Sequence, residues 1–121
     1  MQFLNKLCPS MKPTDLMFVV LLAIVTVMHV LSWSEEPPSV DPVNFLMALD
    51  HYDVATDRPH PTGYPLFVGL GRATSFVVGK AHAYQLVNLF MLIGAGICLY
   101  LLMRKLGRTE VGFASAALLM T

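Results

Sequence analysis

Two long apolar segments constrain the fold of this chain more than any other feature. Residues 16–33 and 83–103 are almost uninterrupted runs of apolar side chains. Each run is long enough to cross about 30 Å of hydrocarbon as a helix. The whole chain is 55% hydrophobic and 13% charged, with a mean hydropathy of +0.61, which is outside the usual range of soluble domains. The sequence therefore predicts an all-α, polytopic transmembrane protein.

Charges at the ends of the first apolar segment predict its orientation. Lys6 and Lys12 precede it and two glutamates follow it, and cytoplasmic flanks carry an excess of Lys and Arg. A cleaved signal peptide is the alternative, but the apolar run exceeds the usual length and no small-residue cleavage site follows it. We therefore expect a cytoplasmic tail over residues 1–15, a first transmembrane helix over 16–33 and an external loop over 34–82.

The second apolar segment ends in three basic residues, so we expect it to return to the cytoplasm. Between the two spans, residues 65–79 form a shorter apolar stretch, which is interrupted by glycines and suits a helix lying on the membrane surface. The apolar residues near the end of the chain resemble the start of another span, so we expect this chain to be the front of a longer protein. The predicted parts are a second transmembrane helix over 83–103, a cytoplasmic turn over 104–109 and the start of a third transmembrane helix over 110–121.

The external loop holds six of the eight carboxylates of the chain. Asp41 followed by Pro42 predicts a helix start, with the aspartate as N-cap, and helical spacing of apolar residues predicts a surface helix over about 42–53. A carboxylate fixed beside the bilayer is also a suitable general base for an acceptor hydroxyl, and the capping and catalytic roles are compatible.

A proline-rich turn follows, reading Arg58-Pro59-His60-Pro61-Thr62-Gly63-Tyr64-Pro65. Alternating prolines predict a stiff, extended path with Gly63 as the hinge. Such a path would fix Arg58, His60 and Tyr64, and an Arg beside a His is a suitable receiver for a phosphate group. The alternative is a rigid turn that only leads the chain back to the membrane. Arg72 beyond it is expected to reach lipid headgroups or, alternatively, a substrate phosphate.

We expect no cofactor and no metal. Asp50 and Asp53 would share one face of a helix and belong to the residue types that bind divalent metals, but a solvated acidic helix end explains the same residues without a metal. Cys8 and Cys98 lack partners at ligand spacing, so both are expected to be free thiols. The net charge is zero and no basic run occurs, which argues against a nucleic-acid partner.

Taken together, the order of these parts resembles the polytopic membrane glycosyltransferases of the C superfamily, in particular bacterial relatives of protein O-mannosyltransferases and aminoarabinose transferases. The resemblance covers essentially all of the chain. It rests on Asp41 soon after the first span, the turn ending in Gly63-Tyr64-Pro65, and Asn88 early in the next span. The family turn is often His-Pro-Pro-Gly-Tyr-Pro, so Thr62 is a departure, and many relatives carry two acidic residues in tandem where this chain has Asp41-Pro42.

The resemblance implies a multi-pass enzyme of the bacterial inner membrane that moves a sugar from a polyprenyl-phosphate donor to an acceptor at the external face. Asp41 matches the catalytic base of that family. Arg58, His60 and Tyr64 are the expected substrate-binding residues. The protein is expected to be embedded in the lipid bilayer. We expect the 121 residues to be inactive by themselves. The alternatives are the front of a transporter or flippase, whose charges more often lie at mid-membrane, and a small non-enzymatic membrane subunit.

Overall fold

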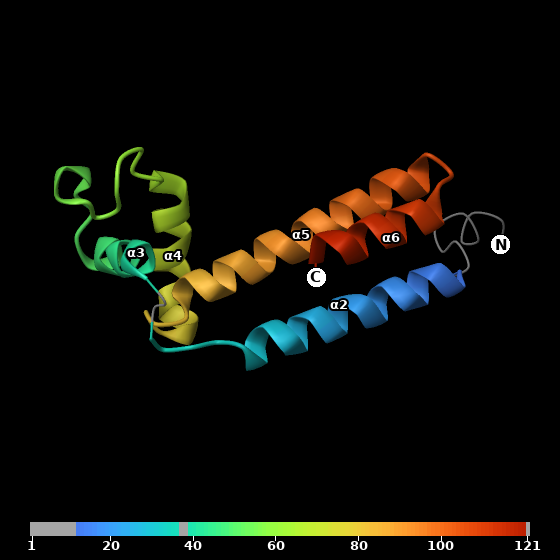
Figure 1. The fold of residues 1–121 in the computed structure, drawn as a ribbon, viewed down its shortest axis with the longest axis horizontal. Helices are drawn as coiled ribbons and strands as arrows, with labels where there is room; N and C mark the ends of the chain where they lie inside the picture. Colours follow the sequence, from blue (N-terminus) through green and yellow to red (C-terminus); the bar gives the residue numbers. More distant parts are fainter. Residues whose placement is uncertain (1–11, 37–38, 121) are drawn as a thin grey trace, which may run out of the picture. The chain divides into compact units, whose positions relative to one another are not determined.

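The structure is a computed structural model that describes residues 12–36 and 39–120. Over these residues it contains five α-helices, one short 3₁₀ helix and no β-strand (Figure 1). The all-α prediction is confirmed. In chain order, the elements are α2 (Pro13–Leu31), α3 (Val40–Asp50), η1 (Val54–Thr56), α4 (Pro65–Val78), α5 (Ala83–Lys105) and α6 (Thr109–Met120).

Helices α2 and α5 are the two described helices that are long and apolar enough to cross a membrane. They have 19 and 23 residues. Because a helix rises about 1.5 Å per residue, each has about the length needed to cross a hydrocarbon core of about 30 Å. Relative to the predicted spans, α2 begins earlier and ends at Leu31, while α5 continues to Lys105. Helix α4 lies at the predicted surface stretch, and α6 lies where a third span was expected to begin. Most of the predicted tail, including Cys8, lies outside the described residues.

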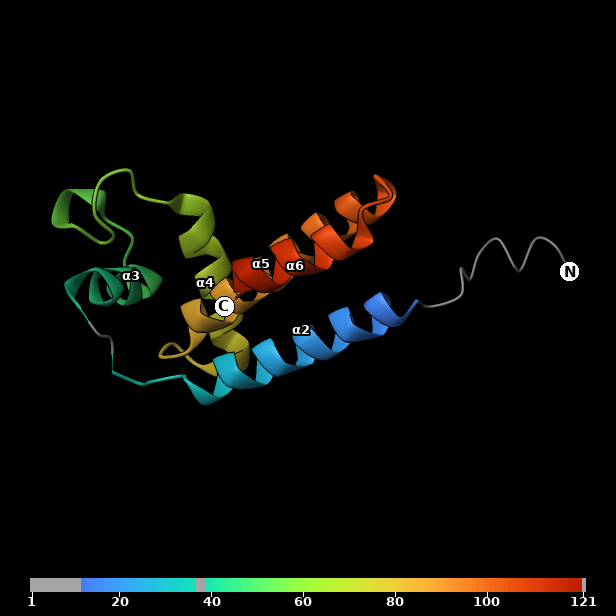
Figure 2. The ribbon, with the colours of Figure 1, turned by 45° about the vertical axis from the view of Figure 1, so that its right-hand side comes forward.

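Two compact units make up the chain, and each of the long helices contributes to both. The first unit comprises Met1–Met28 and Leu92–Thr121. In it, α6 runs back along the C-terminal half of α5 (Figures 1 and 2). Phe18 of α2 stacks on Tyr100 of α5 with ring centroids 4.1 Å apart, and Ala116 of α6 completes this buried core.

A buried carboxylate lies beside that core. Asp15 is 7% exposed, accepts a hydrogen bond from the Tyr100 hydroxyl at 2.6 Å and pairs with Arg104 at 3.0 Å. A buried charge is tolerated only when it is paired and hydrogen-bonded in this way. The interaction therefore ties the start of α2 to the end of α5 within this unit.

The second unit, His29–Met91, contains α3, η1, α4 and the first turns of α5. Helix α3 packs beside α4 (Figure 2). Its bounds differ from the predicted helix at 42–53. It starts at Val40 with Ser39 as N-cap, and it ends at Asp50 because Asp53 instead caps η1, accepting from the Ala55 amide at 3.0 Å.

Candidate functional site

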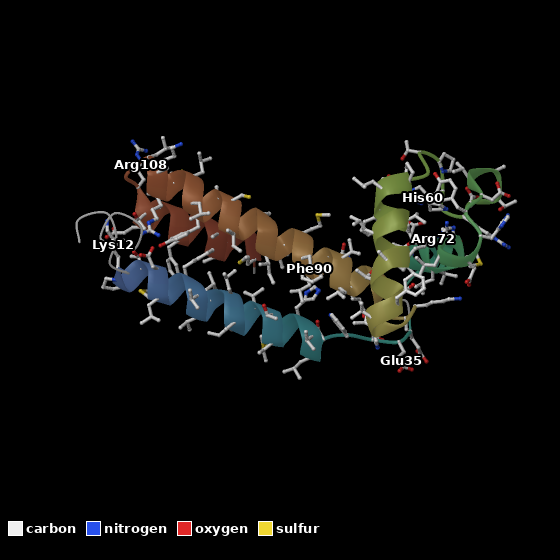
Figure 3. All side chains as sticks on the ribbon, turned by 180° about the vertical axis from the view of Figure 1, so that it is seen from behind. Lys12, Glu35, His60, Arg72, Phe90 and Arg108 are labelled. Carbon is white, nitrogen blue, oxygen red and sulfur yellow. The ribbon has the colours of Figure 1, made fainter. Side chains whose placement is uncertain are left out.

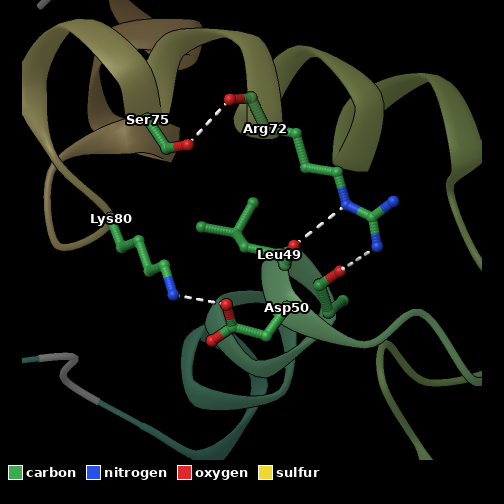
Figure 4. A network of polar contacts seen from close by, with 6 residues as sticks. Leu49, Asp50, Arg72, Ser75 and Lys80 are labelled. Carbon is green, nitrogen blue, oxygen red and sulfur yellow. Dashed lines mark hydrogen bonds and ion pairs between the residues drawn. The ribbon is translucent and has the colours of Figure 1, made fainter.

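Helix α3 is anchored at its C-terminal end by Arg72 of α4. The guanidinium donates from Nε to the Leu49 carbonyl and from Nη2 to the Ala48 carbonyl, both at 3.0 Å (Figure 4). The last carbonyls of a helix have no partner inside the helix, and a cation at this end also suits the helix dipole. Lys80 forms a further ion pair with Asp50. Arg72 was expected to reach a lipid headgroup or a phosphate, and the structure instead places it on this helix end.

A cluster of aromatic rings holds the middle of α3 against its neighbours. Phe45 contacts His60, Tyr64, Phe67 and Tyr84, with centroid distances of 5.4 to 5.7 Å. The Tyr84 hydroxyl also donates to the Phe45 carbonyl at 2.9 Å. These five residues, here called the aromatic cluster, join α3, the proline-rich turn, α4 and the first turn of α5.

The close packing of α4 against Tyr84 depends on Gly71. A Cβ at this position would lie 2.5 Å from Tyr84 Cε1 and 3.0 Å from Leu49 Cδ2. Only a residue without a side chain leaves room for both neighbours. Gly71 therefore sets the distance at which α4, α3 and α5 meet in this unit.

The proline-rich turn is tighter than the extended path that alternating prolines predict. Asp53 and Arg58 pair through two backbone hydrogen bonds of 2.8 and 2.9 Å, and the Gly63 amide donates to the His60 carbonyl at 3.1 Å. Thr62, Gly63 and Tyr64 all have positive φ, of 50°, 77° and 45°. The extended-path prediction is wrong because three consecutive left-handed residues reverse the chain before Pro65 opens α4.

The turn brings two of the predicted substrate-binding residues together. His60 and Tyr64 lie in edge contact, with ring centroids 5.4 Å apart, and both belong to the aromatic cluster. His60 Nδ1 is buried and has no hydrogen-bond partner among the described residues. Figure 3 shows His60 beside the start of α4. Arg58 is held through its backbone, and its guanidinium makes no hydrogen bond or ion pair with a described residue.

Asp41 lies in the first turn of α3 and is exposed. It is not the N-cap that the sequence predicts, since Ser39 takes that position. Its carboxylate makes no hydrogen bond or ion pair with any residue that the structure describes. Asp41 precedes Phe45 by one helical turn, so the two share a face of α3. The helix that the aromatic cluster anchors therefore carries a carboxylate with no partner in the described part of the chain.

A cavity of about 560 Å³ opens within the second unit beside this helix. Its lining mixes carboxylates, amides and hydroxyls with aromatic rings, a combination that suits a polar ligand with one apolar face. Pro42, adjacent to Asp41, and Phe45 contribute to the wall from α3. The remaining wall includes Ser34, Glu35, Glu36, Phe67, Tyr84, Gln85 and Asn88.

Two residues of the cavity wall, Tyr84 and Gln85, were not among the predicted site residues. Tyr84 anchors α3, and Gln85 donates from Nε2 to the Ser34 carbonyl at 3.0 Å while its Oε1 lies 2.7 Å from His82 Nδ1. Both are polar side chains at the beginning of an apolar helix. That position was the available signal, because a partly buried polar group at the start of an apolar helix needs a hydrogen-bond partner.

The metal alternative involved Asp50 and Asp53 on one face of a helix. Helix α3 ends at Asp50, so the two carboxylates do not share a helical face, and each has a partner of its own in Lys80 and η1. Among the described residues, no three His, Cys, Asp or Glu side chains gather as metal ligands.

Comparison with protein families, curated proteins and solved structures finds no match for this chain.

Proposed function

We propose that this chain is the N-terminal part of a membrane glycosyltransferase that uses a polyprenyl-phosphate-linked sugar at the external membrane face. The observation that carries the proposal is that Asp41, in the first turn of α3, is exposed and makes no hydrogen bond or ion pair with a described residue. Its neighbour Pro42 lines a cavity whose wall is polar and aromatic. General bases work best when a rigid element holds them close to the reacting group. The anchoring of α3 by Arg72 and Tyr84 supplies that rigidity.

In the proposed reaction, Asp41 takes the proton from an acceptor hydroxyl. The acceptor oxygen forms a bond to the anomeric carbon as the bond from that carbon to the phosphate oxygen breaks. The electron pair leaves with the polyprenyl phosphate, and the configuration at the anomeric carbon inverts. The departing phosphate is an anion, so cationic groups must lie beside it. Arg58 and, in its protonated form, His60 are the proposed groups, and both belong to the proline-rich turn, which does not contribute to the cavity wall.

This function also requires a membrane topology. We propose that α2 and α5 span the bilayer, that the N-terminus and the turn between α5 and α6 are cytoplasmic, and that α6 begins a third span. The exposed aliphatic side chains of α2, which include Ile24, Val27 and Met28, support contact with lipid.

The test compares two single carboxylate-to-amide changes in the membrane protein that carries this chain. Asp41→Asn removes the proposed base without changing the shape of the side chain, so transfer should fall by about 10²- to 10⁴-fold. Asp57→Asn is the matched control, because Asp57 is exposed, has a positive φ of 55° that asparagine tolerates, and does not line the cavity. Its activity should stay within about twofold of the unchanged protein.

The measurement is transfer of labelled mannose or aminoarabinose from a polyprenyl-phosphate carrier in isolated membranes. Equal expression of both variants is verified by immunoblot. Full turnover by Asp41→Asn would remove Asp41 from the base role. Movement of the lipid-linked sugar across the membrane without a new glycosidic bond would instead favour a flippase.

A further inference from the structure

A second cavity, of about 640 Å³, lies in the first unit, and its residues are remote in sequence from those of the candidate functional site. Its wall comes from the residues before and at the start of α2 and from the turn between α5 and α6. These are Lys12, Pro13, Thr14, Gly107, Arg108, Thr109, Glu110 and Val111. Figure 3 shows Lys12 and Arg108 at the same end of this unit.

Two cations in this wall are available to a ligand. The Lys12 ammonium and the Arg108 guanidinium are exposed and make no hydrogen bond or ion pair with a described residue, while the Lys12 charge also attracts the nearby Asp15 carboxylate. The neighbouring Arg104 is already engaged by Asp15. Glu110 is the one acidic side chain in the wall, so the lining has an excess of positive charge. The hydroxyl of Thr109 and the first amides of α6 add donors at the same place.

Exposed apolar side chains belong to the wall of the cavity or lie close in sequence to the wall residues. Leu16 and Met17 of α2 are 58% and 52% exposed, and Leu106 and Val111 beside the turn are 64% and 47% exposed. A free phosphate ion gains nothing from such neighbours. A ligand with an anionic head and hydrocarbon tails matches both the cations and the apolar surroundings.

We infer that this cavity binds the headgroup of an anionic phospholipid, with the phosphate between Lys12 and Arg108 and the acyl chains along α2 and α6. The inference requires α2 and α5 to lie in a bilayer, but it does not depend on sugar transfer. It assigns the cytoplasmic end of the chain to lipid recognition.

The experiment is native mass spectrometry of the 121-residue chain in detergent micelles, titrated with phosphatidylglycerol or phosphatidylcholine. Phosphatidylglycerol should bind at least about tenfold more tightly, since phosphatidylcholine carries a cationic choline that Lys12 and Arg108 repel. The double variant Lys12→Gln/Arg108→Gln should lose this preference. Lys105→Gln is the matched control, because Lys105 is an exposed cation that does not line the cavity.

A third variant keeps the test meaningful even if the double variant unfolds. Glu110→Gln removes the negative charge from the cavity, so phosphatidylglycerol should bind severalfold more tightly, a gain that unfolding cannot produce. Equal binding of the two lipids, or a loss in Lys105→Gln as large as in the double variant, would overturn the inference. Displacement of phosphatidylglycerol by millimolar inorganic phosphate would also overturn it, because the site would then recognise phosphate alone.

Discussion

The aspartates of this chain differ in whether a neighbouring group pairs with the negatively charged carboxylate. Asp15 is neutralised by Arg104, Asp50 pairs with Lys80, and Asp53 caps η1. Asp41 is exposed and has no such partner among the described residues. The sequence points to Asp41 through the family resemblance, because its position matches that of the catalytic base. The structure adds that three of the other aspartates have structural partners.

The polar side chain of His60 lies in a largely aromatic environment. Its Nδ1 atom is buried without a hydrogen-bond partner among the described residues, while its ring packs against Phe45 and Tyr64. An unsatisfied buried polar atom costs about 1–3 kcal/mol. The position therefore favours an apolar ring on grounds of stability, which makes the imidazole a candidate for a functional role.

We expect His60→Phe to lower sugar transfer without lowering thermal stability. Phenylalanine keeps a planar ring against Phe45 and removes the unpaired nitrogen, so the thermal unfolding midpoint in detergent should stay the same or rise. Sugar transfer should fall at least about tenfold, because the group proposed to face the departing phosphate is lost.

The control for this change is His51→Phe, since His51 is exposed at the C-terminal end of α3 and lies outside the aromatic cluster. This variant should leave both the thermal unfolding midpoint and sugar transfer unchanged. A marked loss of stability in His60→Phe would show that the imidazole makes a structural hydrogen bond after all.

At the scale of elements, local signals located the helices and tertiary contacts set their ends. Pro65 opens α4 as the sequence predicts, because proline suits the first turn of a helix. The end of α3 was misplaced, since Asp53 forms its own turn and Arg72 caps the helix from a different element. The contact between Arg72 and the Ala48 carbonyl joins residues far apart in sequence, so no local pattern predicts it.

The packing of α4 offers a matched pair of glycine substitutions. Gly71→Ala should destabilise the second unit by about 1–3 kcal/mol, because the added methyl group would overlap the Tyr84 ring. Gly69→Ala lies on the same helix but has no neighbouring atom within 4 Å of the added carbon. It should be neutral or stabilising by up to about 1 kcal/mol, owing to the higher helix propensity of alanine.

Both glycine variants are measured by chemical unfolding in mixed micelles and by hydrogen exchange of the α3 and α4 amides. Faster exchange should appear in Gly71→Ala at α3 as well as α4. Equal unfolding free energies and equal exchange rates in the two variants would mean that α4 does not pack closely on Tyr84.

For the whole molecule, the apolar lengths of α2 and α5 and the charges at their ends support the proposed topology. Single cysteines in a background without Cys8 and Cys98 test it. Thr56→Cys in the loop after α3 should react with a membrane-impermeant maleimide added to the periplasmic side of spheroplasts. Arg108→Cys should react only after the membrane is opened, because the basic turn is expected in the cytoplasm. Labelling of both positions from outside would contradict the two-span arrangement.

The sequence by itself determined the helical class and the two segments able to cross a membrane, because hydropathy is a local property of the chain. Asp41 as the candidate base also came from the sequence, through the family resemblance, and stays a prediction. Only the tertiary structure decided that Arg72 and Tyr84 anchor α3, that His60 and Tyr64 share one aromatic cluster, and that Lys12 and Arg108 line a common cavity. Those contacts join residues separated by many positions. They depend on where whole helices pack, which the order of residues along any one segment does not specify.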